Sequence, residues 1–205
     1  MNRSRLMGLA ALAASIAAPA GAVELSPAVA QLYESVSIYP PKNNAMTVCY
    51  GFVCRRRALF DFTAADKRAL GAIMAAGKAS PAAERAALKK AVVWFDKRVA
   101  PLIGTGVRVA RADSQRGGDA TNFDCWDTTR NVTALMVILQ DWNMLRHHTV
   151  GDPRYRGNFL VLQNAHNTAV VKERASNREW AVDMWTAAFA QPPDVMPVAQ
   201  WMTEK

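Results

Sequence analysis

The stretch that most restricts the fold of this chain runs from Asp124 to Leu139. Asp124 is a residue type that caps helix N-termini, and it precedes a block, Val132 to Leu139, that is apolar on nearly every side. A helix of this kind has no polar face to turn toward solvent. The sequence therefore predicts a buried helix that begins just after Asp124, with the other elements packed around it.

Cys125 falls in the first turn of this predicted helix. Unpaired backbone N–H groups and the positive end of the helix dipole favour the thiolate form, which is the nucleophile. Asp124 acts in the opposite direction, because its negative charge raises the pKa of a neighbouring thiol. We take Cys125 as a candidate catalytic nucleophile; the alternative is a buried cysteine with no chemical role.

The N-terminus determines the compartment in which this thiol would work. Arg3 and Arg5 precede an uncharged stretch from Leu6 to Ala18, and Ala20-Gly21-Ala22 is a small-x-small cleavage site. This pattern predicts a signal peptide over residues 1–22, with an apolar part too short to span a bilayer. We expect a periplasmic or secreted protein in which residues 23–205 form a single domain.

The net charge of +8 falls to +6 when Arg3 and Arg5 are removed. A basic exported protein is attracted to anionic cell-wall polymer, which stays open as a partner beside a protein or peptide substrate. No segment combines a basic run with interleaved aromatic residues, so we expect no nucleic-acid partner. We also expect no membrane span in the mature chain.

The other two cysteines, Cys49 and Cys54, are five residues apart around Gly51, which is able to take a tight turn. An oxidising compartment permits a local disulfide between them. Half of a metal site is the alternative, but no histidine or further cysteine lies near them in sequence to complete it. A disulfide would leave Cys125 as the single free thiol.

Helix signals appear before the cysteine helix. Thr63 to Asp66 resembles a capping box and opens a helix that ends near Gly77. Ser80-Pro81 starts a second helix, which we expect to stop before Pro101 and Gly104 and to form an antiparallel pair with the first. The Pro-containing segment from Val23 to Lys42 is predicted to be an extended arm.

A polar, Gly-rich stretch from Gly104 to Phe123 is predicted to be a loop that leads to Cys125. Long loops beside catalytic residues are often binding loops.

Two strand-like segments after the helix are joined by a short polar turn, and they are predicted to pair antiparallel. If Glu173 lies opposite Arg178, then Thr168 lies opposite Asp183. His166 and Asp183 then point from the same face of the sheet as diagonal neighbours, with Cβ atoms about 7–8 Å apart. That distance allows the carboxylate to hydrogen-bond to the imidazole.

An imidazole that is held by a carboxylate and faces a thiol is what nucleophilic cysteine catalysis requires. We therefore predict a catalytic triad of Cys125, His166 and Asp183. A zinc site formed by His147, His148 and His166 is less favoured, because adjacent strand residues point to opposite faces. We expect no metal ligands among these residues.

Three short segments carry a resemblance to a known family. They are Asp-Cys-Trp-Asp-Thr-Thr at 124–129, His-Asn-Thr-Ala-Val-Val at 166–171 and Trp-Ala-Val-Asp-Met-Trp at 180–185. In this order the chain resembles the transglutaminase-like superfamily and is similar to bacterial transglutaminase-like cysteine proteinases. The resemblance implies an α+β fold with a papain-like core, in which a helix bearing the Cys packs on an antiparallel sheet bearing His and Asp.

The resemblance also implies the roles of the three residues: Cys125 as nucleophile, His166 as general base and Asp183 as its orienting partner. The related proteinases usually carry an acidic residue after the cysteine that helps to bind calcium. Trp126 occupies this place here, so we expect no cofactor. The backbone N–H of Cys125 is the one oxyanion donor that can be assigned.

These observations predict an exported cysteine hydrolase or acyltransferase that cleaves a peptide or isopeptide bond through an acyl-cysteine intermediate. A cell-wall (peptidoglycan) peptidase of the Cys-His type is a second interpretation. A binding module that keeps the fold with a silent triad is a third.

Overall fold

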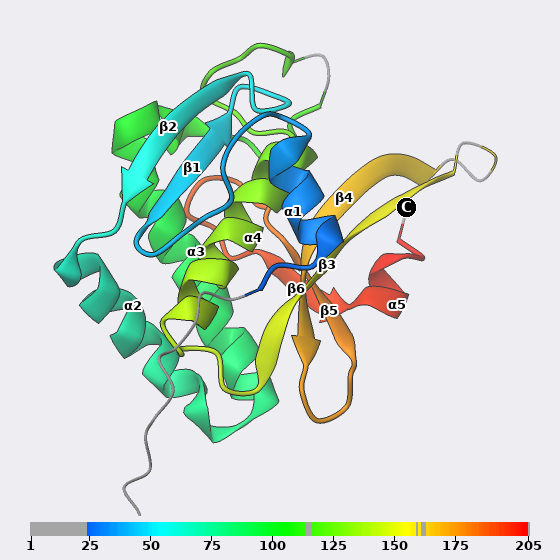
Figure 1. Cartoon of the computed structure of the whole chain (residues 1–205). Helices are drawn as coiled ribbons and strands as arrows, with labels where there is room; N and C mark the ends of the chain where they lie inside the picture. Colours follow the sequence, from blue (N-terminus) through cyan, green and yellow to red (C-terminus); the bar gives the residue numbers. More distant parts are fainter. Residues whose placement is uncertain (1–23, 114–115, 159, 161–162, 205) are drawn as a thin grey trace, which may run out of the picture.

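The computed structural model describes residues 24–113, 116–158, 160 and 163–204, so the predicted signal peptide at 1–22 lies outside the described residues. The described chain is an α+β structure with two antiparallel sheets (Figure 1). One sheet is the hairpin of β1 (Ala45–Tyr50) and β2 (Arg56–Asp61). The other has the order β3-β4-β5-β6, formed by His148–Asn158, Gln163–Glu173, Glu179–Asp183 and Asp194–Pro197.

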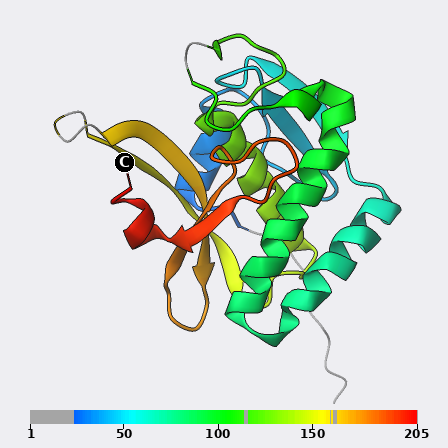
Figure 2. The same ribbon diagram turned by 180° about the vertical axis from the view of Figure 1, so that it is seen from behind.

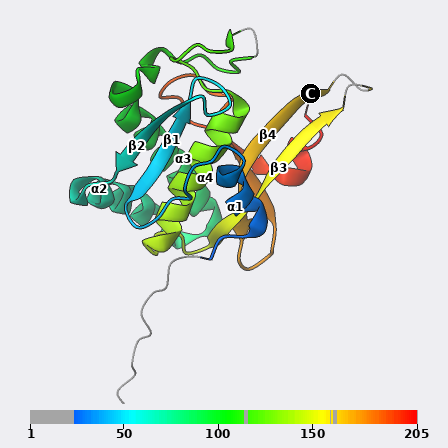
Figure 3. The same cartoon turned by 45° about the horizontal axis from the view of Figure 1, so that its top comes forward.

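Helix α4 (Cys125–Asp141) occupies the centre of the molecule, between the β1–β2 hairpin and the four-stranded sheet (Figures 1 and 3). Every residue from Asp127 to Leu139 is buried. Asp124 caps the helix, since its carboxylate accepts the N–H of Asp127 at 2.7 Å. The predicted buried helix beginning after Asp124 is therefore confirmed.

The hydrophobic core explains the place of α4. Its apolar side chains pack with Ala169 and Val171 of β4 and with Val182 of β5 in one continuous cluster. The helix that carries Cys125 thus rests on the sheet that carries His166 and Asp183. None of the described helices is both long and apolar enough to cross a bilayer.

The predicted helical pair consists of α2 (Ala64–Ala75) and α3 (Pro81–Ile103), which lie side by side (Figure 2) and are joined by the 3-10 turn η1 (Ala76–Ala79). The capping box at Thr63 and Asp66 is confirmed. The predicted stop is right for Gly104, because α3 ends at Ile103, and wrong for Pro101, which lies inside the helix. Pro101 lies in the last turn of α3, where few helical bonds remain to be broken, and Gly104, with φ 78°, caps the helix. The short η2 (Thr105–Val107) follows.

The predicted extended arm at the N-terminus is also wrong, because helix α1 (Pro27–Glu34) forms within it. The Ser26 hydroxyl accepts the N–H of Val29 at 3.2 Å, and Pro27 occupies the first turn. This is the same Ser-Pro start signal that correctly predicts α3. Val29, Leu32 and Tyr33 are buried, so α1 is part of the core.

The predicted pairing of β4 and β5 is confirmed. Ala169 lies opposite Val182 and Lys172 lies opposite Glu179, which is the register that places Thr168 opposite Asp183. The side-chain ion pair between Glu173 and Arg178, from which the register was derived, is not formed. The Glu173 carboxylate instead binds Arg85 of α3 at 3.0 Å, although the backbone N–H of Glu173 does bond to the carbonyl of Arg178 at 2.8 Å.

The C-terminal segment adds two elements that were not predicted, β6 and the short helix α5 (Val198–Trp201). Val198 and Trp201 of α5 form a second apolar cluster with Val170 of β4 and Ala181 of β5. Helix α5 therefore covers the sheet face that carries the even-numbered residues of β4, which include His166.

Candidate functional site

His166 and Asp183 are brought into direct contact by the register of β4 and β5. Nε2 of His166 lies 2.5 Å from Oδ2 of Asp183, and both side chains are buried. Diagonal neighbours on one face of an antiparallel pair are within reach of each other, which explains the contact. The structure thus places two of the three predicted site residues as the sequence analysis expected.

Asp183 is fixed by two further donors. The indole N–H of Trp201 donates to its Oδ2 at 2.9 Å, and the backbone N–H of Trp185 donates to its Oδ1 at 3.2 Å. The rings of these two residues also contact the imidazole, with centroid distances of 4.5 Å for Trp185 and 5.4 Å for Trp201. Since a buried carboxylate needs such partners, the two tryptophans hold the His166–Asp183 pair in place.

The other imidazole nitrogen, Nδ1 of His166, is buried and has no hydrogen-bond partner among the described residues. A bond from Nε2–H to Asp183 leaves Nδ1 with a free lone pair in the neutral ring. This tautomer is inferred from the hydrogen-bond partners. Nδ1 is then the atom able to accept a proton.

Cys125 is half-buried at the start of α4, and the backbone N–H of Asn167, the residue after His166, lies close enough to stabilise its thiolate. Burial and the charge of Asp124 nevertheless raise the pKa of the thiol to about 11, and the carboxylate of Asp183 acts in the same direction. The expectation that Asp124 raises this pKa agrees with the structure. The expectation that the helix start favours the thiolate is outweighed by burial.

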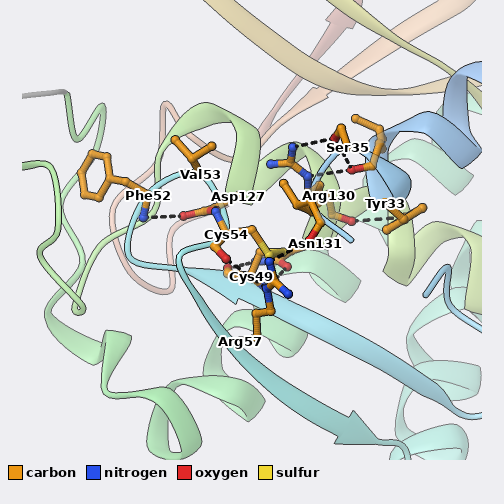
Figure 4. Close-up of a disulfide and its surroundings, with 12 residues drawn as sticks. Tyr33, Ser35, Cys49, Phe52, Val53, Cys54, Arg57, Asp127, Arg130 and Asn131 are labelled. Atoms are coloured by element: carbon orange, nitrogen blue, oxygen red, sulfur yellow. Dashed lines mark hydrogen bonds between the residues drawn. A yellow bond between two sulfur atoms is a disulfide. The ribbon is translucent and has the colours of Figure 1, made fainter. Parts of the chain in front are cut away.

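The disulfide between Cys49 and Cys54 is present, and it closes a loop that packs against the start of α4 (Figure 4). Residues 51 to 54 of this loop have positive φ values between 52° and 74°. The side chain of Asn131 binds both the N–H and the carbonyl of Cys49 at 2.8 Å. The loop is thus attached to the helix that carries Cys125.

Three successive N–H groups of this loop donate to the carboxylates on either side of Cys125. Asp127 accepts from Phe52 at 2.9 Å and from Cys54 at 2.6 Å, and Asp124 accepts from Val53 at 2.7 Å. Burial and the nearby Asp124 raise the pKa of Asp127 to about 7, although the two N–H groups lower it. The sequence analysis missed this use of Asp127.

The same contacts decide whether these carboxylates fit calcium. Each oxygen of Asp124 and Asp127 accepts a backbone N–H, from Asp127 itself or from the disulfide loop. A cation would meet the positive ends of these N–H dipoles. Four backbone N–H groups thus already face these oxygens, and a calcium ion at the start of α4 would have to share the oxygens with them.

The three histidines have separate partners, so they do not gather around one point. His147 lies 3.1 Å from the carbonyl of Lys78, and His148 binds Glu84 at 2.9 Å, whereas His166 binds Asp183. The two adjacent residues thus point in different directions, as expected for a strand start.

The predicted loop from Gly104 to Phe123 reaches the site through Trp185. The backbone N–H of Arg111 donates to the carbonyl of Trp185 at 2.8 Å, and the indole N–H of Trp185 donates to the carbonyl of Ala112 at 2.9 Å. A hollow of about 210 Å³ lies here, lined by residues that include Arg111, His166 and Trp185. A larger hollow of about 700 Å³ lies between the β4–β5 turn and α5 and is lined by none of the predicted site residues.

Replacing Asp124 with asparagine is expected to separate two effects of this carboxylate. The thiol should be alkylated faster at a fixed pH, because removing the charge lowers the pKa of Cys125. Stability should fall by about 1 kcal/mol, because the cap weakens and an amide NH₂ can face the N–H of Val53. Iodoacetamide kinetics and thermal unfolding measure the two quantities.

Asp61→Asn is the matched control, since it removes the same charge at the opposite end of the β1–β2 hairpin from the disulfide loop. Slower alkylation of Asp124→Asn than of this control would contradict the account.

The geometry brings the oriented imidazole and the carboxylate of Asp183 together beside a hollow, and it places the half-buried thiol of Cys125 near the backbone N–H of Asn167. Among the described residues, the thiol makes no hydrogen bond to Nδ1 of His166. Compared with protein-family models, curated proteins and solved structures, the chain matches none of them.

Proposed function

We propose that this chain is an exported cysteine hydrolase or acyltransferase with a papain-like core of the transglutaminase-like type, which cleaves peptide or isopeptide bonds. The observation that carries the proposal is the 2.5 Å contact between His166 and Asp183. The residue after this histidine turns its N–H toward Cys125. A buried His–Asp pair beside a thiol is the arrangement that activates a cysteine nucleophile.

In the proposed reaction the Sγ–H bond of Cys125 breaks and its proton moves to Nδ1 of His166. The sulfur forms a bond to the amide carbonyl carbon, and the backbone N–H of Cys125 donates to the oxyanion that develops. The imidazolium then gives its proton to the leaving amine as the C–N bond breaks. Water attacks the acyl-cysteine for hydrolysis, or a second amine attacks it for transfer, and the thiol is restored.

The raised pKa of Cys125 makes the histidine necessary in this scheme. With a pKa of about 11, a thiol without a base has very little thiolate near neutral pH. Asp183 stabilises the imidazolium that forms when His166 takes the proton, because the two charges are in contact.

Removing divalent metal ions is expected to leave the activity unchanged. The carboxylates beside Cys125 already accept backbone N–H groups, so the arrangement of the site does not need a cation to hold them. Turnover before and after treatment with a calcium chelator checks this. Loss of activity that added calcium restores would show that the loop and the carboxylates rearrange around an ion.

The direct test of the proposal uses a thioester probe that transfers its acyl group to a reactive thiol. We expect an acyl adduct on the peptide that contains Cys125, located by mass spectrometry, and no adduct in Cys125→Ala. Adducts on lysines alone, or equal labelling of an unfolded control, would overturn the proposal.

A further inference from the structure

The hollow beside His166 has a lining rich in hydrogen-bond donors. It measures about 210 Å³, and three segments meet there: the 104–123 loop, the end of the β3–β4 hairpin and the residues after β5. Its lining residues are Arg111, Asp113, Arg156, Asn164, His166, Trp185 and Thr186. Two guanidinium groups stand against one carboxylate in this lining.

Arg156 is a buried side chain in the lining of this hollow. It is 8% exposed, it lies opposite His166 in the β3–β4 pairing, and its guanidinium lies 4.3 Å from the ring centroid of Trp201. One nitrogen donates to the carbonyl of Trp201. A guanidinium has five N–H donors, so the group retains donors for a further acceptor.

The carboxylate of Glu204 lies 3.6 Å from the guanidinium of Arg156, which is long for a charge-assisted hydrogen bond. Its side chain is 37% exposed, so solvent weakens the pair. A carboxylate from a substrate would compete with Glu204 for the same guanidinium.

Arg111 lies on the loop side of the hollow and is exposed. Its backbone has φ 53° and is fixed by the bond to the carbonyl of Trp185. Asp113, two residues further on, also lines the hollow and adds a negative charge there. Arg111, on the 104–123 loop, and Arg156, on β3, thus line the same hollow as the imidazole of His166.

We propose that this hollow binds a carboxylate of the substrate, so that the preferred substrate is an acidic peptide whose carboxylate lies next to the bond that is cleaved. Arg156 and Arg111 supply the charge-assisted hydrogen bonds. The bound carboxylate lies beside His166, which is the proposed base of the reaction. This inference rests on the proposed function, because it takes Cys125 and His166 as the reacting groups.

The test compares two alkylating probes of similar size, anionic iodoacetate and neutral iodoacetamide, on the full mature chain. We expect the ratio of their rate constants at Cys125 to exceed the ratio for free cysteine. Arg111→Gln should lower this ratio about threefold to tenfold, as expected for the loss of one partly exposed charged contact. Glu204→Gln should raise it, because the competing carboxylate is removed from Arg156.

Arg174→Gln serves as the matched control, since it removes one exposed positive charge at the turn between β4 and β5, at the other end of β4 from His166. Its ratio should equal that of the wild type. Arg156→Gln should also lower the ratio, because it removes the other guanidinium of the hollow. If this variant fails to fold, Arg111→Gln and Glu204→Gln still test the site, because their expected effects have opposite signs.

The two proposals fail in different ways in this experiment. A ratio equal to that of free cysteine, unchanged in Arg111→Gln and Glu204→Gln, overturns the carboxylate site even when the iodoacetamide rate depends on His166. An iodoacetamide rate that does not depend on His166 overturns the proposed function, whatever the ratio.

Discussion

Replacing His166 with glutamine is expected to lower the rate of acyl transfer at least about 10³-fold, because the thiol then has no base to take its proton. The pKa of Cys125 is about 11, so unassisted ionisation cannot compensate near neutral pH. Turnover of a thioester substrate at saturating and subsaturating concentration measures the effect. We expect the loss in kcat, since the imidazole acts in the chemical step.

Two variants separate chemistry from folding in this prediction. His147→Gln removes a half-buried imidazole whose one bond among the described residues is to the carbonyl of Lys78, and it should keep wild-type activity. Thermal unfolding of His166→Gln shows whether the protein is still folded at the assay temperature. A folded His166→Gln variant that retains more than about a tenth of the activity would contradict the role of His166 as base.

The second large effect is expected on stability, in Glu84→Ala. Glu84 of α3 is buried, and its carboxylate accepts the backbone N–H groups of residues 146, 147 and 148 at 2.6 to 3.1 Å, together with Nδ1 of His148 at 2.9 Å. Removing it leaves these donors buried without a partner, which costs about 3–5 kcal/mol. For a domain of this size the melting temperature should fall by about 6–20 °C.

Glu34→Ala is the matched control, because Glu34 is exposed at the end of α1 and should change the melting temperature little. A Glu84→Ala variant as stable as Glu34→Ala would contradict the assigned role.

The network extends from His148 to Arg85, which also binds Glu173 at 3.0 Å and stacks 3.5 Å from the ring centroid of Trp180.

Glu84 also gives this stability a pH dependence. Burial raises the pKa of this carboxyl. The bonds from His148 and from the backbone N–H groups together lower the pKa by more, so it lies below its ordinary value of 4.5. A carboxyl whose pKa is lowered in the folded state stabilises the fold at any pH above its ordinary pKa. This contribution is lost as the pH falls from the ordinary pKa through the lowered pKa. The difference in stability between wild type and Glu84→Gln should therefore shrink on acidification below that ordinary value.

The parts of the fold that the sequence predicted correctly are those with local signals. Asp124 before an all-apolar helix, the capping box at Thr63 and the register of β4 with β5 each depend on residues close in sequence. Helix α1 had such a signal in Ser26-Pro27, and it was missed because proline was taken to indicate extended structure. Strand β2 was missed because only Phe60 within it is buried, which leaves no alternating apolar pattern.

The site divides in the same way. The contact of His166 with Asp183 follows from one hairpin, so the sequence was sufficient to predict it. The bond from Trp201 to Asp183 and the approach of Arg111 to His166 join segments far apart in the chain. The hydrogen bonds from the disulfide loop to Asp124 and Asp127 depend on four successive residues with positive φ. Residue types other than glycine give no sequence signal for a positive φ.

The measurement that tests the central claim most directly is the pH profile of alkylation of Cys125 by iodoacetamide, in the wild type and in His166→Gln. The account predicts that wild-type Cys125 reacts at least about 10²-fold faster than His166→Gln at about pH 6 to 7, because the imidazole takes the thiol proton as the sulfur attacks. It predicts that His166→Gln reacts appreciably only as the pH rises toward the raised pKa of the thiol, about 11. Superimposable profiles for the two proteins would show that the imidazole does not control the thiol, and the silent binding module would then be the better interpretation.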